Sequence, residues 1–287
     1  MSDGERHLVG LIGSGIGTSM SPALHEREAD RHGLRYLYQL IDLDSGPGDV
    51  GELVAAARRL GFRGLNITHP AKRDVVKYLD ELAPEAAELG AVNTVVFRDG
   101  RAVGHNTDRY GFGTGLARAL PGARLDHVVQ LGAGGAGLAV ASALAGAGAR
   151  RLSVADVDPE RAGRLARTIA AHHAVAVEPI APELVPARLA VADGLVNATP
   201  VGMEGHPGTP VGLEHLRAGL WVADVIYRPL DTALIRAARE RGCRVADGGG
   251  MVVYQAAASF RLFTGLTPDE ERMYDDFSEL TSGGHRA

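Results

Sequence analysis

The sequence has little of what several protein classes require. Cys243 is the only cysteine among 287 residues, so no disulfide within the chain and no thiolate cluster can form. The histidines include no H-E-x-x-H pair, and we expect no bound metal. No apolar run approaches the roughly 20 residues that cross a bilayer, and the amino terminus lacks the apolar core of a signal peptide. These absences predict a cytoplasmic protein with no membrane partner.

The chain also lacks a large excess of charge of one sign. Lys and Arg number 30 against 35 Asp and Glu, which leaves a formal net charge of −5. This balance predicts no nucleic-acid partner, because such proteins carry a basic surface. The length is comfortable for two domains.

Glycine is abundant, and one glycine-rich turn organises the second half of the chain. An apolar run, 128–131, stops at Gly132, and an alanine-rich segment at helical spacing precedes a second apolar run that ends at Asp156. In this G-x-G-x-x-G pattern Gly132 allows a tight turn, Gly134 lets backbone approach a pyrophosphate, and Gly137 lets helix pack on strand. The alternative is a turn in another α/β protein, but strand, turn and helix together favour dinucleotide binding. The residues of the turn are Gly132, Gly134, Gly135, Ala136 and Gly137.

Acidic residues after the second strand favour NAD over NADP. Asp156 and Asp158 would repel a 2′-phosphate but could accept hydrogen bonds from a ribose diol. Arg161 and Arg164 weaken this inference, although their helical spacing with Glu160 is typical of a solvated helix face.

The first half repeats strands and helices. Strands are predicted at 7–13, 36–43 and 64–68, with helices at 22–32, 51–60 and 78–90. Asp99-Gly100 separates two further strand-like runs and predicts a hairpin, so the first sheet should be mixed.

Three polar features of this half have two interpretations each. Ser21 is placed to cap a helix that has Pro22 at its first position, or to hold a carboxylate together with Ser19. Lys72 is either a solvated lysine or a ligand-binding group at a strand end. Asp108 is either a helix cap alone or a functional residue.

The second half continues as an open α/β domain. A polar segment at 181–192 precedes predicted strands at 193–197 and 221–227, and helices follow from Met251. We expect a substrate-binding catalytic domain at 1–108, an NAD-binding domain at 109–250, and C-terminal helices at 251–287 that return to the first domain.

Together these segments resemble the shikimate dehydrogenase family, and most closely its NAD-dependent quinate/shikimate dehydrogenase branch. The resemblance covers nearly the whole chain through motifs in the same order: SMSP, NITHPAK, GAVNT, GHNTD, GAGGAG, NATPVGM, DVIYRP and GGGMVVYQ. It implies an α/β protein of two domains, a mixed-sheet substrate domain and a Rossmann-type dinucleotide-binding domain, with an active-site cleft between them. It further implies reversible oxidation of a ring hydroxyl of shikimate or quinate.

The resemblance also assigns roles to single residues. Lys72 and Asp108 would be catalytic, with Lys72 exchanging the hydroxyl proton and Asp108 orienting amine and substrate. The substrate would contact Ser19, Ser21, Asn66, Thr68, Asn93, Gln255 and Tyr227. The nicotinamide side would be lined by Thr199, Val225, Tyr227, Gly248 and Met251.

Two departures from the family bear on specificity. Gly15 and Thr18 replace a proline and a histidine of the common shikimate enzymes, which leaves shikimate, quinate or an amino analogue open as substrate. Asp156-Val157-Asp158 replaces the N-R-T of NADP-using relatives, which again favours NAD. The alternatives are an NADP-dependent shikimate dehydrogenase of aromatic amino acid biosynthesis, a dehydrogenase similar to methylenetetrahydrofolate dehydrogenase, and a non-catalytic NAD-responsive binding protein. A monomer and a homodimer are both compatible with the sequence.

Overall fold

The computed structural model describes residues 6–46 and 48–282, which form two compact units. The first unit comprises the described residues up to Thr107 and from Val253 onward, and the second comprises Asp108–Val252. The division falls inside helix α9, Gly249–Thr264. Both units combine a sheet with helices, which confirms the α/β class.

The sheet of the first unit is mixed. Its strands are β1 (Arg6–Gly13), β2 (Arg35–Asp42), β3 (Gly64–Ile67), β4 (Glu81–Leu82), β5 (Thr94–Arg98) and β6 (Arg101–His105). They lie in the order β2-β1-β3-β5-β6-β4, and β5 runs antiparallel to β3 and β6. The expected hairpin is confirmed at Asp99-Gly100, where φ is 52° and 71°. Positive φ at both positions is what a tight two-residue hairpin turn requires.

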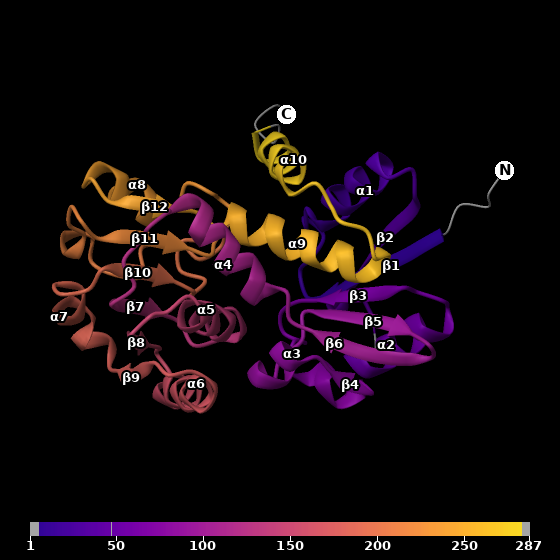
Figure 1. Cartoon of the computed structure of the whole chain (residues 1–287), viewed down its shortest axis with the longest axis horizontal. Helices are drawn as coiled ribbons and strands as arrows, with labels where there is room; N and C mark the ends of the chain where they lie inside the picture. The colour runs from indigo at the N-terminus through magenta and orange to yellow at the C-terminus, as the bar shows by residue number, and fades with distance from the viewer. Residues whose placement is uncertain (1–5, 47, 283–287) are drawn as a thin grey trace. The chain divides into compact units, whose positions relative to one another are not determined.

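Both faces of this sheet are buried, because its side chains alternate between the two faces and helices pack on each. Its helices are α1 (Ser21–Arg31), α2 (Val50–Arg59), α3 (Pro84–Leu89), the end of α9 and α10 (Glu270–Ser282). Ile12 and Val95 pack with Val54 of α2, whereas the adjacent Val96 packs with Phe263 of α9 on the other face. Figure 1 shows the C-terminal part of α9 alongside β1 and β3, where Phe263 packs.

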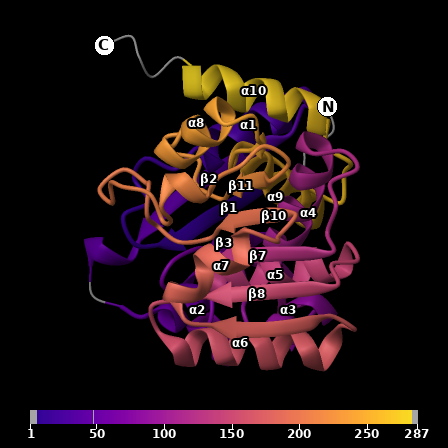
Figure 2. The same ribbon diagram turned by 90° about the vertical axis from the view of Figure 1, so that its left-hand side faces the viewer.

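The second unit is a doubly wound parallel sheet. Its strands are β7 (His127–Leu131), β8 (Arg151–Ala155), β9 (Ala176–Ile180), β10 (Gly194–Asn197), β11 (Trp221–Asp224) and β12 (Arg244–Ala246). They lie in the order β12-β11-β10-β7-β8-β9 with every neighbouring pair parallel. Figure 2 shows β11, β10, β7 and β8 side by side in this order. The order reverses at β7, where open α/β sheets bind ligands beyond the strand ends.

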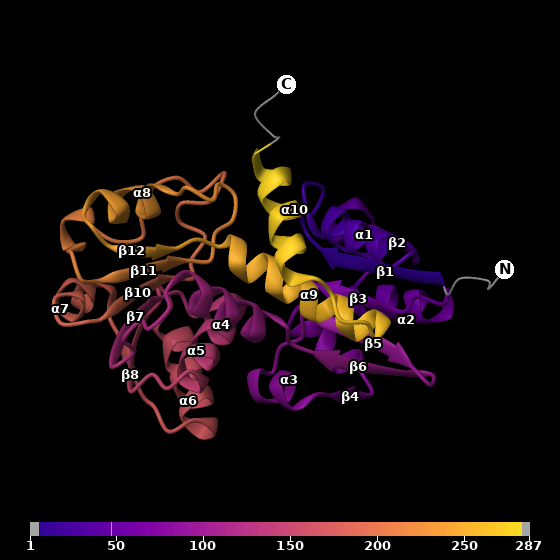
Figure 3. The same cartoon turned by 45° about the horizontal axis from the view of Figure 1, so that its top comes forward.

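Helices cover both faces of the second sheet. They are α4 (Asp108–Ala119), α5 (Gly135–Gly146), α6 (Pro159–His172), α7 (Val185–Leu189) and α8 (Ala233–Glu240). Leu189 of α7 and Leu234 of α8 pack with Val129 and Val222 on one face. Figures 1 and 3 show α4, α5 and α6 on the opposite face.

Several predicted elements were wrong in detail. The helix expected at 78–90 is instead β4 followed by α3, which begins at Pro84. Asp80 interrupts that helix because its backbone N–H and its carboxylate both bond to Ala102 of β6. The polar segment 181–192 contains α7, a short helix that was not predicted from the sequence. None of the described helices is long and apolar enough to span a membrane.

Candidate functional site

The turn after β7 shows why its glycines differ from one another. Gly132 has a φ of +97°, and a Cβ there would lie 2.5 Å from the Ala198 carbonyl oxygen. A Cβ on Gly137 would lie 2.3 Å from the Gly132 carbonyl oxygen. A Cβ on Gly134 would meet no heavy atom within 4 Å. The fold itself therefore needs Gly132 and Gly137, whereas Gly134 leaves space beside the N-terminus of α5 that an anion could occupy.

A buried glutamine fixes the conformation of this turn. Gln130 of β7 is fully buried, and its Nε2 donates to the carbonyl oxygens of Gly132 at 2.9 Å and Gly137 at 2.8 Å. Gly135 and Ala136 are the first residues of α5. Backbone N–H groups in a first helical turn have no partner inside the helix, so they can donate to a bound phosphate.

The acidic residues after β8 have separate structural roles. Asp156 accepts hydrogen bonds from the N–H of Ala133, at 2.7 Å, and of Asp158, at 2.9 Å, which ties the glycine turn to the end of β8. Asp158 caps α6 by accepting from the Glu160 N–H at 2.9 Å, and Arg161 lies 3.3 Å from its other oxygen. Since each carboxylate oxygen has two lone pairs, both residues can still accept from a ribose hydroxyl.

Asn197 organises the loop after β10. Its Oδ1 accepts from the N–H and the hydroxyl of Thr199, at 3.0 and 2.7 Å. Its Nδ2 donates to the Val201 carbonyl at 3.1 Å and to Asp224 at 3.0 Å. The buried amide of Asn197 therefore fixes the conformation of the loop that carries Thr199, a predicted cofactor residue.

Asp224 ends β11 earlier than the predicted boundary at residue 227. Its carboxylate accepts from the Ile226 N–H at 3.1 Å, which turns the chain out of the sheet, and from the Thr232 hydroxyl at 2.8 Å. Burial raises the pKa of this carboxyl to about 6, against the lowering effect of its hydrogen bonds. Asp224 was not among the site residues predicted from the sequence.

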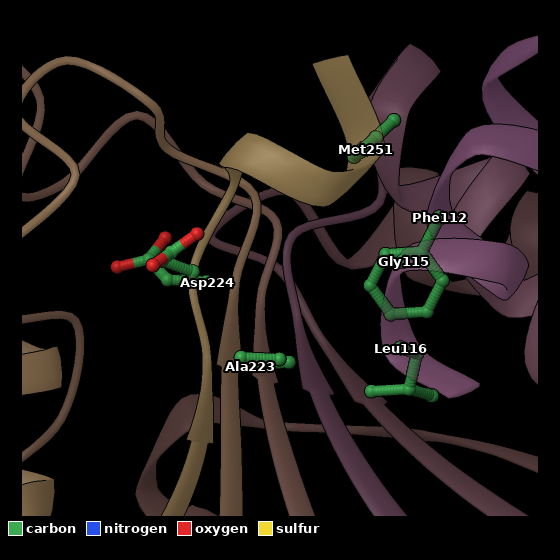
Figure 4. Close-up of a pocket in the computed structure, with 8 residues that line it drawn as sticks. Phe112, Gly115, Leu116, Ala223, Asp224 and Met251 are labelled. Carbon is green, nitrogen blue, oxygen red and sulfur yellow. The ribbon is translucent and has the colours of Figure 1, made fainter. Parts of the chain in front are cut away.

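The remaining cofactor candidates lie on the loops after β11 and β12 and in the first turn of α9. Val225 donates its N–H to the Asn197 carbonyl, and burial raises the pKa of Tyr227. A Cβ on Gly248 would lie 2.4 Å from the Ile226 carbonyl oxygen, so these two loops touch. Met251 lines a small cavity nearby, in which Phe112, Gly115 and Leu116 of α4 lie across from Ala223 and Asp224 of β11 (Figure 4).

In the first unit, two predicted amides lie at the centre of a buried polar cluster. Asn66 of β3 donates from Nδ2 to Thr94 Oγ1 and Ser259 Oγ, both at 3.0 Å. Asn93 accepts on Oδ1 from the Thr107 N–H at 2.7 Å and donates from Nδ2 to the Thr107 hydroxyl at 2.9 Å. Both amides are buried, and their bonds fix their orientation at the ends of β3 and β5.

Four members of this cluster were missed by the sequence analysis. They are Tyr38, Thr94, Thr107 and Ser259. The Tyr38 hydroxyl donates to Asn66 Oδ1 at 2.8 Å, and Ser259 also donates to the Gln255 carbonyl at 2.9 Å. Ser259 follows Gln255 by one helical turn, and that spacing was the available signal.

The loop between β1 and α1 differs from one of the predictions. One of the two interpretations of Ser21 made it the N-cap of the first helix, but α1 begins at Ser21 itself and Met20 is the cap residue, without a side-chain hydrogen bond. The hydroxyl of Ser19 instead accepts from the Ser21 N–H at 3.2 Å. Burial raises the pKa of Tyr38, and a side-chain hydrogen bond with Ser21 opposes this increase, so this loop connects to the buried cluster.

The other substrate and catalytic candidates follow β3 or lie on helices. Thr68 comes directly after β3, and its N–H donates to the Ile12 carbonyl at 2.9 Å. Lys72 is half-buried, and its carbonyl accepts from the Val92 N–H at 2.8 Å. Gln255 is half-buried on α9, and Asp108 is a buried residue at the start of α4, directly after Thr107.

These groups suit two kinds of ligand. The second unit offers an open glycine, a helix N-terminus and acidic strand ends, which is the donor and acceptor set for a dinucleotide. The first unit offers oriented amides and hydroxyls, which can both donate to and accept from the hydroxyls of a small polyol.

Comparison with known families agrees with this division. Residues 11–95 match a family model described as "Shikimate dehydrogenase substrate binding domain". Residues 248–275 match one described as "Shikimate 5'-dehydrogenase C-terminal domain".

Individual relatives extend the similarity over nearly the whole chain. A Streptomyces avermitilis protein named "Shikimate dehydrogenase (NADP(+))" is 60% identical over 280 residues, covering 96% of each chain. A Corynebacterium efficiens protein named "Quinate/shikimate dehydrogenase (NAD(+))" is 50% identical over 278 residues, covering 95% of this chain and 98% of the relative. The solved quinate dehydrogenase of Corynebacterium glutamicum in complex with NAD superposes with a TM-score of 0.91 at 47% identity, covering 96% of this chain and 99% of that one.

Proposed function

The chain belongs to the shikimate dehydrogenase family, and from that premise we propose that it oxidises a ring hydroxyl of shikimate, quinate or both with NAD as hydride acceptor. The reaction is reversible and gives 3-dehydroshikimate or 3-dehydroquinate. Relatives named for each acid support the substrate class. The chain is accordingly an oxidoreductase that uses NAD(P).

The residues of the second unit fit a dinucleotide. Gly134 provides the open space that a pyrophosphate needs, and Gly135 and Ala136 supply N–H groups of the first turn of α5. Thr199 and Met251 would lie on the nicotinamide side. When bound, the nicotinamide ring supplies the hydride acceptor, and the chain's own groups bind and orient it.

One observation carries the preference for NAD. Val157, between Asp156 and Asp158, is 92% exposed and offers no charge to a 2′-phosphate. Arg161 and Arg164 are paired with Asp158, at 3.3 and 3.9 Å, so the local cations are already balanced by carboxylates. A bare ribose suits such acceptors better than a phosphate does.

NADP is the second candidate cofactor, and the names of two similar relatives support it. The Streptomyces avermitilis protein and a Pseudarthrobacter chlorophenolicus protein at 56% identity are both named as NADP(+) enzymes.

The substrate side rests on the buried cluster of the first unit. We place the ring hydroxyls at Asn66, Asn93, Thr68 and Gln255, because fixed amides discriminate between hydroxyl positions. Ser19 and Ser21 would hold the carboxylate at the start of α1, and Tyr227 is a further proposed substrate contact.

Lys72 would exchange the proton. Oxidation removes a hydride from carbon and a proton from the attached oxygen, and a neutral amine at Lys72 Nζ would accept that proton. In the reverse direction its ammonium form would donate the proton to the carbonyl oxygen. Asp108 would orient both the amine and the substrate hydroxyl.

Steady-state kinetics test this proposal. Protein mixed with NAD and either shikimate or quinate should produce the absorbance of NADH, with kcat/KM for NAD exceeding that for NADP by about tenfold or more. A higher kcat/KM with NADP would transfer the assignment to the second candidate cofactor. An absence of turnover with either acid and either cofactor would reject the proposed substrates.

A further inference from the structure

A single buried carboxylate joins three segments at the ligand-binding edge of the second sheet. Asp224 is 2% exposed and accepts hydrogen bonds from the Asn197 side chain, the Ile226 N–H and the Thr232 hydroxyl. These donors come from the end of β10, the loop after β11 and the N-terminus of α8. All three are donors, so the arrangement matches an ionised carboxylate, which only accepts.

The bonds continue outward from Asp224 into the loop that carries Thr199. Asn197 donates one N–H to Asp224 and the other to the Val201 carbonyl, while its oxygen accepts from Thr199 twice. Asp224 fixes which way the Asn197 amide faces, because a flipped amide would present its oxygen to the carboxylate. The conformation of the loop at residues 198–203 therefore depends on a side chain one strand away.

We propose that Asp224 is a positioning residue for the nicotinamide end of the bound dinucleotide. It acts by holding the loops after β10 and β11 in the form that binds nicotinamide, and it does not touch the ligand itself. The inference rests on the proposed function, which places Thr199, Val225 and Tyr227 on that side. The adenosine end, bound at the glycine turn and Asp158, does not depend on Asp224.

Burial of this carboxylate is explained by such a role better than by stability alone. A buried carboxylate pays a desolvation cost that a well-packed apolar side chain would avoid. The helix cap on α8 needs only Thr232, whose hydroxyl accepts from the Ile235 N–H at 3.2 Å. An acceptor at position 224 is required by the loops after β10 and β11, because Asn197 and Ile226 both donate to it.

The charged group that faces Asp224 is Asp247, in the loop between β12 and α9, and its charge raises the pKa of Asp224 further. The side chains that α4 presents to the same cavity, Phe112 and Leu116, are uncharged. Protonation of Asp224 near pH 6 would replace one acceptor by a donor and leave a loop donor unmatched. Affinity for the nicotinamide end should consequently fall below that pH.

Two ligands separate positioning from general damage. NAD contains the nicotinamide, and ADP-ribose has the same adenosine and pyrophosphate without it. Calorimetric titration of Asp224→Asn should show about tenfold weaker binding of NAD and less than twofold change for ADP-ribose. Thr232→Ala is the matched control, since it removes one bond to Asp224 and the cap of α8 but leaves Asn197 and Ile226 held. It should lower stability without changing the ratio of the two affinities.

The wild-type protein provides the same test without a variant. Its affinity for NAD relative to ADP-ribose should fall about threefold or more between pH 7.5 and pH 5.5, because Asp224 gains its proton in that interval. An unchanged ratio in both experiments, or equal loss for both ligands, would overturn the role of Asp224. Failure of the wild type to bind either ligand at pH 7.5 would overturn the proposed function, and this inference with it. Normal ADP-ribose binding with a constant ratio would overturn the inference alone.

Discussion

Lys72 is the residue on which the proposed chemistry depends. General acid–base help is worth about 10²- to 10⁴-fold in rate, so Lys72→Ala should reduce kcat by that factor. Binding of NAD should be unchanged, because the glycine turn belongs to the other unit. Stopped-time assays with shikimate or quinate, combined with calorimetry of NAD binding, measure both quantities.

Arg73→Ala provides the matched control for Lys72. Arg73 is the adjacent cation, and its side chain is exposed. It precedes the short 3-10 helix Asp74–Tyr78 but makes no capping hydrogen bond to it. Its removal should leave kcat within about twofold. Equal activity of the two variants would remove Lys72 from the mechanism.

Single residues also show where sequence reasoning ends. Asn66 and Asn93 could be identified because they sit in recognisable motifs at strand ends, and the structure brings both into one cluster. Tyr38 could not be identified, because its partner Asn66 is 28 residues away in sequence and only the folded sheet brings them together. Ser259 had one local signal, its spacing from Gln255, but its contact with Asn66 spans 193 residues and appears only in the fold. Asp224 was missed for the same reason, since its role appears only once β10 and β11 are neighbours.

At the scale of elements, the glycine turn between β7 and α5 allows fold and binding to be separated. Gly137→Ala would place a methyl 2.3 Å from the Gly132 carbonyl oxygen, so we expect a loss of about 1–3 kcal/mol in the free energy of unfolding. Gly134→Ala would meet no protein atom, and the φ of −75° at Gly134 suits alanine, so stability should change by less than about 1 kcal/mol. Urea denaturation measures both.

Gly134→Ala should change NAD affinity although it leaves stability nearly unchanged. A methyl at Gly134 enters the space assigned to the pyrophosphate, so Gly134→Ala should weaken NAD binding by about tenfold or more despite normal stability. Normal NAD affinity in this folded variant would place the pyrophosphate elsewhere.

Elements with a strong local signal were predicted correctly, and those set by distant pairing were not. Asp99-Gly100 specifies its hairpin because few other residues tolerate positive φ at both positions. The run at 78–90 has good helix formers, yet Asp80 is drawn into bonds with Ala102 of a neighbouring strand and the helix starts only at Pro84. Tertiary hydrogen bonds outweighed helix propensity there.

For the whole molecule, pH should act on the two units with opposite sign. His25, in the first unit, is buried among aromatic rings with a pKa lowered to about 3 by desolvation. The unfolded chain binds this proton first, near the ordinary histidine pKa of 6.5, so the first unit loses stability as pH falls from about 6.5 toward 3. Asp224, in the second unit, has its pKa raised from 3.8 to about 6. Here the native state binds the proton first, so the second unit gains stability as pH falls from about 6 to 3.8.

The difference in the free energy of unfolding between wild type and each variant removes the contribution of the other titrating groups. Between pH 7 and pH 5 the advantage of wild type over His25→Phe should shrink, and its advantage over Asp224→Asn should grow, each by up to about 1.4 kcal/mol per pH unit. Trp221, the single tryptophan of the sequence, lies on β11 and reports unfolding of the second unit by fluorescence, while circular dichroism follows both units. Because the two groups lie in different units, His25→Phe should alter the pH dependence of the dichroism transition more than that of the fluorescence transition. Parallel pH profiles for wild type and both variants would show that neither buried group changes its proton affinity on folding.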